Sequence, residues 1–388
     1  MARTRWSDDT FLDAIRKEVD TRADDCIRRL VEENGIEGSK ALFRHASSND
    51  PTLPPEAPAA MRDFFAETEA LPPGVDLARL DRGERVWMKH AFPAALVLLA
   101  KALPEGYAAP SFGEILHLTH DLERHPYRRL LGVMQMVVNV CTTGGFEEGG
   151  KAVVSAQKMR LLHAAIRTHI VPTYMPHYDA ARFGPPVNFE DMLATVMGFS
   201  YLVIDGLGIL GTPLPDEEAE DLYYVWRVFS QVVGIHPAGQ PESGEYVPAN
   251  VAEAAEFYES YKRRHYVGPE ENPKGVVLAR DNLNMLRDML PRSWRAVGLG
   301  ILPRIYMQEL CGTEACARVG IRPVMGHGLL KKAALAVVRL SHRAVDTAPE
   351  SVDDTVSRLF FQGMITRSWK GEVTFLVPDT LADVRRLA

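Results

Sequence analysis

The chain has 388 residues, of which 46% are hydrophobic and 24% charged, a composition that supports a large apolar core. Its net charge of −7 argues against nucleic acid as a partner, and four cysteines do not make a disulfide framework. No apolar stretch follows the N-terminal arginines, and the longest apolar segment, Ala194–Leu210, is short for a bilayer span and contains Asp205. We therefore expect a cytoplasmic protein without a membrane span.

Helical periodicity dominates the chain from its start. Ser7 is placed to cap a first helix that runs to about Glu33, where Asn34-Gly35 is expected to end it. Proline- and glycine-rich breaks separate the next helical stretches. These stretches are 59–69, 86–103 and 111–123.

The middle of the chain predicts the most deeply buried helices. Pro126 suits the first turn of a helix over Tyr127–Cys141, which is apolar almost all round and should be buried. A glycine-rich loop leads to another helix that ends near Ile170. The segment 171–187 holds four prolines and should be irregular, and Asn188 then caps a long apolar helix.

The rest of the chain continues the helical pattern. Acidic residues at 216–218 begin another helix, and three or four more are expected over 247–346. Strand-like clusters occur only at 359–361 and 372–377, where a small C-terminal hairpin and its absence are both left open. Without a linker or a fixed-period repeat, the sequence predicts one all-α domain over 1–388, with many helices packed as in globins.

Most short motifs are better explained as structural features. The run from Gly206 to Gly211 spells a dinucleotide fingerprint, but a helix is expected before it instead of a strand, which favours helix packing. His117, His120 and His125 lie close in sequence, and a metal role and a surface role both remain open for them.

His163 is the strongest candidate for a functional residue. It lies within an apolar helix, with Arg160 and Arg167 on the same face one turn before and after it. A lone histidine on such a helix is usually a satisfied core residue. Buried arginines require anions, however, and carboxylates are scarce nearby in the sequence. A cofactor with two carboxylates, such as haem, would supply them, so both interpretations stay open.

Two blocks, Lys158–Arg167 and Pro186–Ser200, together resemble the catalytic domain of the latex-clearing protein (rubber oxygenase) family. That family includes the oxygenase of mycophenolic acid biosynthesis. The resemblance is good over 80–240 and looser elsewhere. Further matching segments are Ile115–Thr119, Arg128–Leu130, Trp226-Arg227 and Gly234-Ile235.

The resemblance implies a helical domain around a buried haem b. It implies that His163 is the proximal iron ligand and that Arg129 lies near the haem. In this interpretation Arg160 and Arg167 bind the propionates of the haem or orient the helix.

The chain departs from the family on the distal side of the haem. Where the family has a lysine that can ligate iron and a threonine, this chain has Gly132 and Val133. The change would leave room over the iron and make the pocket drier. His125, seven residues before Gly132, would point toward this space or else lie at the surface.

These residues lead to a haem b-dependent oxygenase that acts on a small apolar substrate, with dioxygen or peroxide as oxidant. Met134, Met136, Val137 and Phe199 are expected to hold the substrate. Oxidative C=C cleavage needs no steady electron supply, whereas C–H monooxygenation would need an external reductase. The alternatives are a haem-binding sensor or carrier without turnover, and a helical protein that has lost haem.

Overall fold

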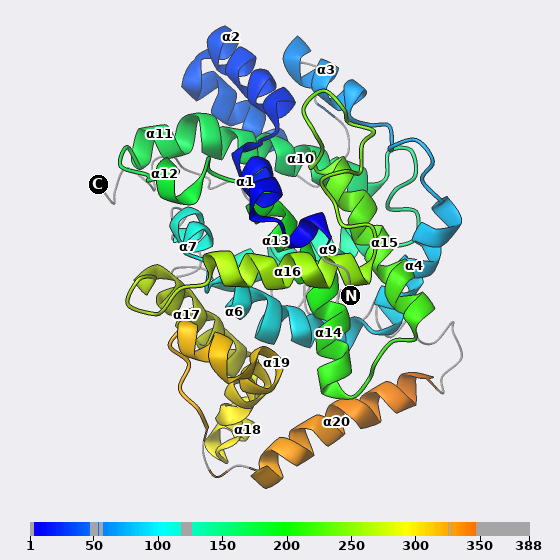
Figure 1. The fold of residues 1–388 in the computed structure, drawn as a ribbon, viewed down its shortest axis with the longest axis vertical. Helices are drawn as coiled ribbons and strands as arrows, with labels where there is room; N and C mark the ends of the chain where they lie inside the picture. Colours follow the sequence, from blue (N-terminus) through cyan, green and yellow to red (C-terminus); the bar gives the residue numbers. More distant parts are fainter. Residues whose placement is uncertain are drawn as a thin grey trace.

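The structure is a computed structural model that describes residues 4–46, 53, 57–117, 126–324, 326 and 328–346 (Figure 1). All regular secondary structure in these residues is helical, which confirms the predicted all-α class. The helices are η1 (Arg5–Ser7), α1 (Asp9–Lys17), α2 (Thr21–Ala46), α3 (Ala59–Glu67), α4 (Leu77–Lys89), α5 (Ala91–Val97), η2 (Leu98–Ala102), α6 (Leu103–Gly106), α7 (Pro110–His117), α9 (Pro126–Cys141), α10 (Lys151–Ala165), η3 (Ile166–Ile170), α11 (Val171–Tyr174), α12 (Ala180–Phe183), α13 (Phe189–Phe199), α14 (Tyr201–Leu210), α15 (Asp216–Val232), α16 (Val251–His265), α17 (Pro273–Met289), α18 (Arg292–Ala296), η4 (Leu299–Ile301), α19 (Leu302–Arg318) and α20 (Gly328–Asp346). The strand-like clusters at 359–361 and 372–377 lie outside the described residues.

The N-terminal segment forms two helices instead of the one that we predicted. Asp8, not Ser7, caps α1, and its side chain accepts a hydrogen bond from the backbone N–H of Thr10. Asp20 starts α2 by accepting from the N–H of Ala23. The expected break at Asn34-Gly35 is present, because Gly35 is non-helical with φ of 67°, and a second helical piece of α2 follows it to Ala46. Glycine adopts this left-handed conformation without the steric cost of a side chain.

The long apolar segment Phe189–Leu210 is divided into α13 and α14 at Ser200, whose φ and ψ are −111° and −84°. As predicted, Asn188 caps α13 by accepting from the N–H of Asp191 at 3.0 Å. Among the described residues, this segment is long and apolar enough to cross a membrane, but 61% of its most apolar window is buried in the fold. It is therefore only a weak candidate for a span. The prolines before Asn188 still leave room for two short helices, α11 and α12.

The glycines of the apparent dinucleotide fingerprint serve helix packing, as we expected. A Cβ on Gly206 would lie 2.4 Å from Cγ1 of Val97, so α14 approaches α5 closely at this point. Gly211 ends α14 in the left-handed conformation, with φ of 83°. The motif therefore marks a helix contact and a helix end.

Two apolar clusters determine where α10 lies. The larger cluster joins most of the helices and contains the fully buried Trp87 and Trp226. A smaller cluster, built around Ile27, Phe64 and Leu161, joins α2 and α3 to one face of α10. α10 also packs against α9, so α2 and α9 both hold the helix that carries His163.

Candidate functional site

His163 lies in the last turn of α10, and its Nδ1 atom is buried without a hydrogen-bond partner among the described residues. Burial, with a smaller contribution from the charge of Arg167, lowers the pKa of the imidazole to about 4. The ring is therefore neutral at physiological pH, which is the form that binds a metal ion.

α10 changes at once from an α-helix to a π-helix, η3, after this turn. π-helical turns are rare in proteins, and those that do occur are often found at functional sites. Within η3, His169 also has a buried nitrogen, Nε2, without a hydrogen-bond partner in the described part of the chain. Two partly buried histidines, each with one buried nitrogen that has no partner among the described residues, thus lie within one stretch of helix.

Arg160, three residues before His163, forms a buried ion pair with Asp20 at the start of α2. Its Nε lies 2.6 Å from Oδ2 and its Nη2 3.1 Å from Oδ1 of Asp20, and both side chains are only 5% exposed. The guanidinium also lies 5.2 Å from the ring centroid of Phe64. Burial raises the pKa of Asp20, but the charge and hydrogen bonds of Arg160 outweigh it and hold this pKa below its ordinary value.

Arg167, four residues after His163, pairs in the same way with Asp24 of α2. Its Nε lies 3.0 Å from both carboxylate oxygens, and its Nη2 lies 2.5 Å from Oδ1. Its Nη1 donates to the carbonyl oxygens of Pro186 and Val187, at 3.4 and 3.3 Å. Val187 is the one non-glycine residue with positive φ in the described residues, at 55°. Arg167 therefore links α10 to α2 and to the strained turn before α13.

The two arginines therefore need no external anion to balance their charge. Asp20 and Asp24 already neutralise them, so the expectation that they bind haem propionates does not agree with these contacts. The other interpretation, that they orient the helix, does. The sequence pattern around His163 does not indicate Asp20 and Asp24, because they precede their partners by 140 and 143 residues.

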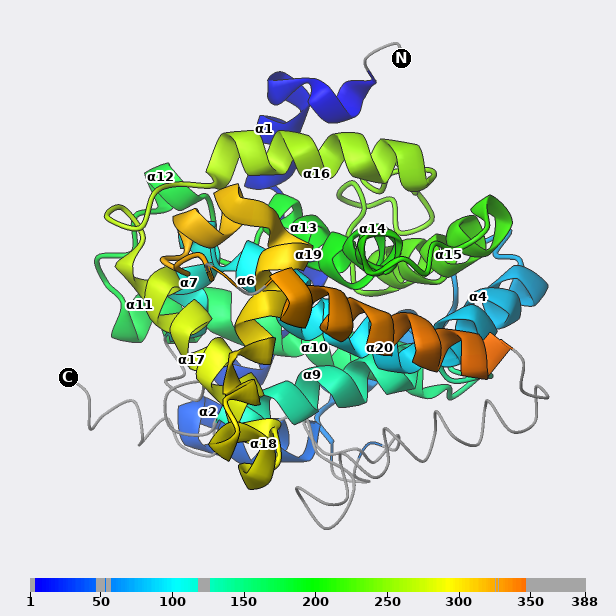
Figure 2. The ribbon, with the colours of Figure 1, turned by 90° about the horizontal axis from the view of Figure 1, so that it is seen from below.

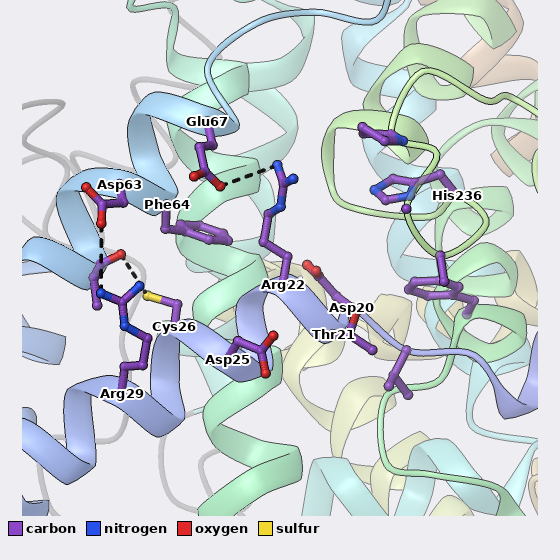
Figure 3. Close-up of a pocket in the computed structure, with 16 residues that line it drawn as sticks. Asp20, Thr21, Arg22, Asp25, Cys26, Arg29, Asp63, Phe64, Glu67 and His236 are labelled. Atoms are coloured by element: carbon purple, nitrogen blue, oxygen red, sulfur yellow. Dashed lines mark hydrogen bonds and ion pairs between the residues drawn. The ribbon is translucent and has the colours of Figure 1, made fainter.

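A cleft of about 380 Å³ opens beside Asp20 (Figure 3). It lies between α2, α3 and the loop that carries His236, and its walls combine charged and apolar side chains. Nη1 of Arg22 lies 3.7 Å from Oε2 of Glu67. None of the predicted site residues lines it. The cleft therefore lies beside the Asp20–Arg160 pair. His163 does not line it, so it is not an apolar pocket around that histidine.

On α9, Gly132 and Val133 are both partly accessible. A Cβ on Gly132 would meet no atom of the described residues within 4 Å, so they leave open space beside this glycine. The residues that we expected to hold a substrate behave differently. Met134, Met136 and Val137 are fully packed into the core, and Phe199 stacks on Trp226 with centroids 5.1 Å apart. None of these four side chains lines the cleft beside Asp20, and their contact with a substrate stays a prediction.

We expect Gly132→Ala to stabilise the protein, because glycine inside a helix costs about 0.5–1 kcal/mol relative to alanine and the added methyl group meets nothing. Urea denaturation should show a gain of that size. Gly206→Ala is the matched comparison in α14, where the methyl group would clash with Val97 and cost roughly 1–3 kcal/mol. A loss of stability in Gly132→Ala would mean that the space beside α9 is filled.

Some predicted residues lie beyond what the structure describes. His120 and His125 are outside the described residues. Arg129 lies in α9 and His117 at the end of α7, but their side chains are not described. In the ranges that are described, no group of three or more His, Cys, Asp or Glu side chains could hold a metal ion.

The acids of the Pro186–Ser200 block form an ionic cluster at the start of α13. The side chain of Glu190 is fully buried. Its Oε2 lies 2.9 Å from Nη1 of Arg16 and 3.0 Å from Nε2 of His265, and its Oε1 lies 3.0 Å from Nε of Arg264. Its neighbour Asp191 accepts from the hydroxyl of Tyr261 at 2.7 Å. The block therefore joins α1, α13 and α16.

This cluster predicts a pH dependence of stability. Burial raises the pKa of Glu190, but His265, Arg16 and Arg264 outweigh it and hold this pKa below its ordinary value of 4.5. A depressed carboxyl pKa stabilises the fold fully above about pH 4.5, and this stabilisation is lost as the pH falls through the folded-state pKa.

We therefore expect Glu190→Gln to lower the free energy of unfolding at neutral pH and to make the loss below pH 4.5 shallower than in wild type. Chemical denaturation over a pH series measures both. The exposed Glu69→Gln should follow the wild-type profile. Parallel profiles for wild type and Glu190→Gln would contradict the expectation.

The comparisons with known proteins agree with this arrangement. Residues 81–340 match the family described as ER-bound oxygenase mpaB/B'/Rubber oxygenase, catalytic domain, well beyond residue 240 where the expected resemblance weakened. The rubber oxygenase of Streptomyces sp. (strain K30) is 23% identical over 238 residues, 59% of this chain and 54% of the relative, so the alignment spans about half of that protein. A solved structure of latex clearing protein LCP in the closed state shares the fold, with a TM-score of 0.70 and 18% identity over 89% of this chain and 90% of that one. The chain belongs to the mpaB and rubber oxygenase catalytic-domain family.

Proposed function

We propose that this chain is a haem b-dependent oxygenase that acts on a small apolar substrate, by oxidative C=C cleavage or C–H oxygenation. Membership of an oxygenase catalytic-domain family supports the reaction class. The observation that carries the haem assignment is the neutral imidazole of His163, whose buried Nδ1 has no hydrogen-bond partner among the described residues.

The described residues fit a haem on physical grounds. A buried polar atom without a hydrogen bond costs about 1–3 kcal/mol, and ligation of a metal by the His163 ring would offset such a cost. The open space beside Gly132 adds room on the neighbouring helix, α9. When bound, the haem supplies the activation of dioxygen or peroxide, which protein side chains do not provide.

The residues around His163 hold it in place. The Asp20–Arg160 and Asp24–Arg167 pairs bind α10 to α2 on both sides of the histidine. Burial keeps the ring unprotonated, so it stays available as a ligand at neutral pH. The role of Arg160 and Arg167 in the proposed enzyme is thus to position the ligand helix, while Arg129 and His125 stay as proposed residues near the reacting oxygen.

In the proposed enzyme, the residues at positions 132 and 133 bear on whether C=C cleavage or C–H oxygenation takes place. Gly132 and Val133 stand where the family has its lysine and threonine, which favours an open coordination position and an apolar substrate. Oxidative C=C cleavage requires only dioxygen, whereas monooxygenation would require an external reductase, and peroxide would replace both. We place this reaction in the cytoplasm.

The same replacement also supports a second candidate, a haem-binding sensor or carrier without turnover, because Gly132 and Val133 remove two polar groups together. Oxygen uptake with a panel of apolar alkenes distinguishes the two. We expect uptake matched by product in the reconstituted wild type and none in His163→Ala. A haem-bound wild type that consumes no oxygen would identify a carrier, and a wild type with no Soret band after reconstitution would exclude haem.

A further inference from the structure

Large exposed apolar side chains gather at one end of the molecule. Among the described residues, Trp294 is 48% exposed, Val297 74% and Leu329 84%, and Met289 and Val337 are also exposed. Three other tryptophans, Trp6, Trp87 and Trp226, are by contrast fully buried, as is usual for so large an apolar side chain. We name the surface formed by Met289, Trp294, Val297, Leu329 and Val337 the apolar end.

The apolar end belongs to a basic part of an acidic chain. Residues 287–339 contain nine Lys or Arg and three Asp or Glu, a net charge of +6 in a chain whose net charge is −7. All three acids are already paired within the segment, Asp288 with Arg295 at 2.7 Å, Glu309 with Lys331 at 2.6 Å and Glu314 with Arg318 at 2.9 Å. Such a charge asymmetry within a chain indicates a partner of opposite charge.

The elements that carry these residues lie together in space. α18 and α20 both lie at the lower end of the molecule in Figure 1, and Figure 2, seen from below, looks onto this end. α20 packs against α14, whose last residues include the exposed Ile209. The exposed apolar side chains thus extend from α17 and α18 to α20 across one end of the fold.

The geometry points to an anionic lipid surface as the partner of the apolar end, and we propose that the protein binds membranes there without spanning them. Tryptophan and aliphatic side chains ringed by arginine and lysine insert at the boundary between headgroups and acyl chains, and the basic residues attract anionic lipids. Because the apolar side chains lie on separate helices, a deformable lipid phase contacts all of them, whereas a folded protein would need a matching socket for each. This proposal does not depend on haem binding.

Cosedimentation with vesicles tests it on the full chain. We expect the protein to bind vesicles of phosphatidylcholine mixed with phosphatidylglycerol, not phosphatidylcholine alone, and to be released by salt. Trp294→Ser with Val297→Ser, and separately Arg287→Glu with Arg292→Glu, should each weaken binding by about tenfold or more. The fluorescence of Trp294 should shift to the blue on binding, and Trp294→Phe should lose that shift.

Control variants at other exposed positions test whether vesicle binding is specific to the apolar end. Leu77→Ser removes an exposed apolar side chain, and Lys17→Glu with Arg182→Glu makes the same change of charge. Both should bind vesicles like wild type, and thermal melting should show all variants folded. Absence of vesicle binding in wild type, equal binding by the apolar-end variants, or equal loss in the control variants would overturn the proposal. So would a change in oligomeric state in the apolar-end variants without vesicle binding, since it would identify a protein interface.

Discussion

His163→Ala is expected to remove the Soret absorbance of the haem-reconstituted protein completely. α10 offers a neutral imidazole with a buried, unpartnered Nδ1, which is the haem ligand in the proposed function, and alanine leaves a space without a ligand. Absorbance spectra before and after reconstitution measure the loss. Added imidazole should enter the space and restore part of the band, which a purely structural loss would not allow.

His169→Ala provides the control in the same helical stretch. Its Nε2 is also buried without a partner among the described residues, but six residues of helix separate it from His163, so the two rings do not share a face. We expect His169→Ala to keep the Soret band. Loss of the band in His169→Ala with its retention in His163→Ala would transfer the ligand role to His169.

Asp20→Asn is expected to lower the free energy of unfolding by about 3–5 kcal/mol, because it leaves the buried guanidinium of Arg160 without its counter-charge. Such a loss is a large part of the total stability of a protein, which is typically about 5–15 kcal/mol. Urea denaturation of the haem-free protein measures it.

Two further variants separate the buried charge from other effects. Replacing both partners, Asp20→Leu with Arg160→Met, should recover much of the stability, because no charge is then left buried. Asp9→Asn breaks the surface ion pair between Asp9 and Arg263, whose Oδ1 and Nη2 lie 2.7 Å apart and whose side chains are each about half exposed. This change should lower the free energy of unfolding far less. An Asp20→Asn variant as stable as Asp9→Asn would contradict the role given to the buried pair.

Much of the fold was predictable because the signals are local. Apolar periodicity predicts helices such as α9 and α10, and Asn188 caps α13 as its residue type suggests. The break between α1 and α2 was missed, since both helices share one apolar pattern. It arises where the Asp20 side chain caps α2 and at the same time accepts from Arg160, and the second contact is tertiary.

The candidate site was predictable only in part. The spacing of Arg160, His163 and Arg167 identifies one helix face, and the family blocks single out the histidine. The carboxylates that pair with the arginines come from α2, and no spacing within α10 indicates them. For the same reason the packing of Met134 and Val137 into the core could not be separated from lining a pocket, because the two roles require the same apolar residue types.

By itself the sequence determined the helical class and the family resemblance, and it singled out His163 as the candidate ligand, since these depend on residue types at short spacing. Only the tertiary structure decided that Asp20 and Asp24 neutralise the arginines on both sides of His163. The physical reason is that a buried charge must find a counter-charge wherever the fold brings one near, and α2 and α10 meet through apolar packing of segments about 140 residues apart.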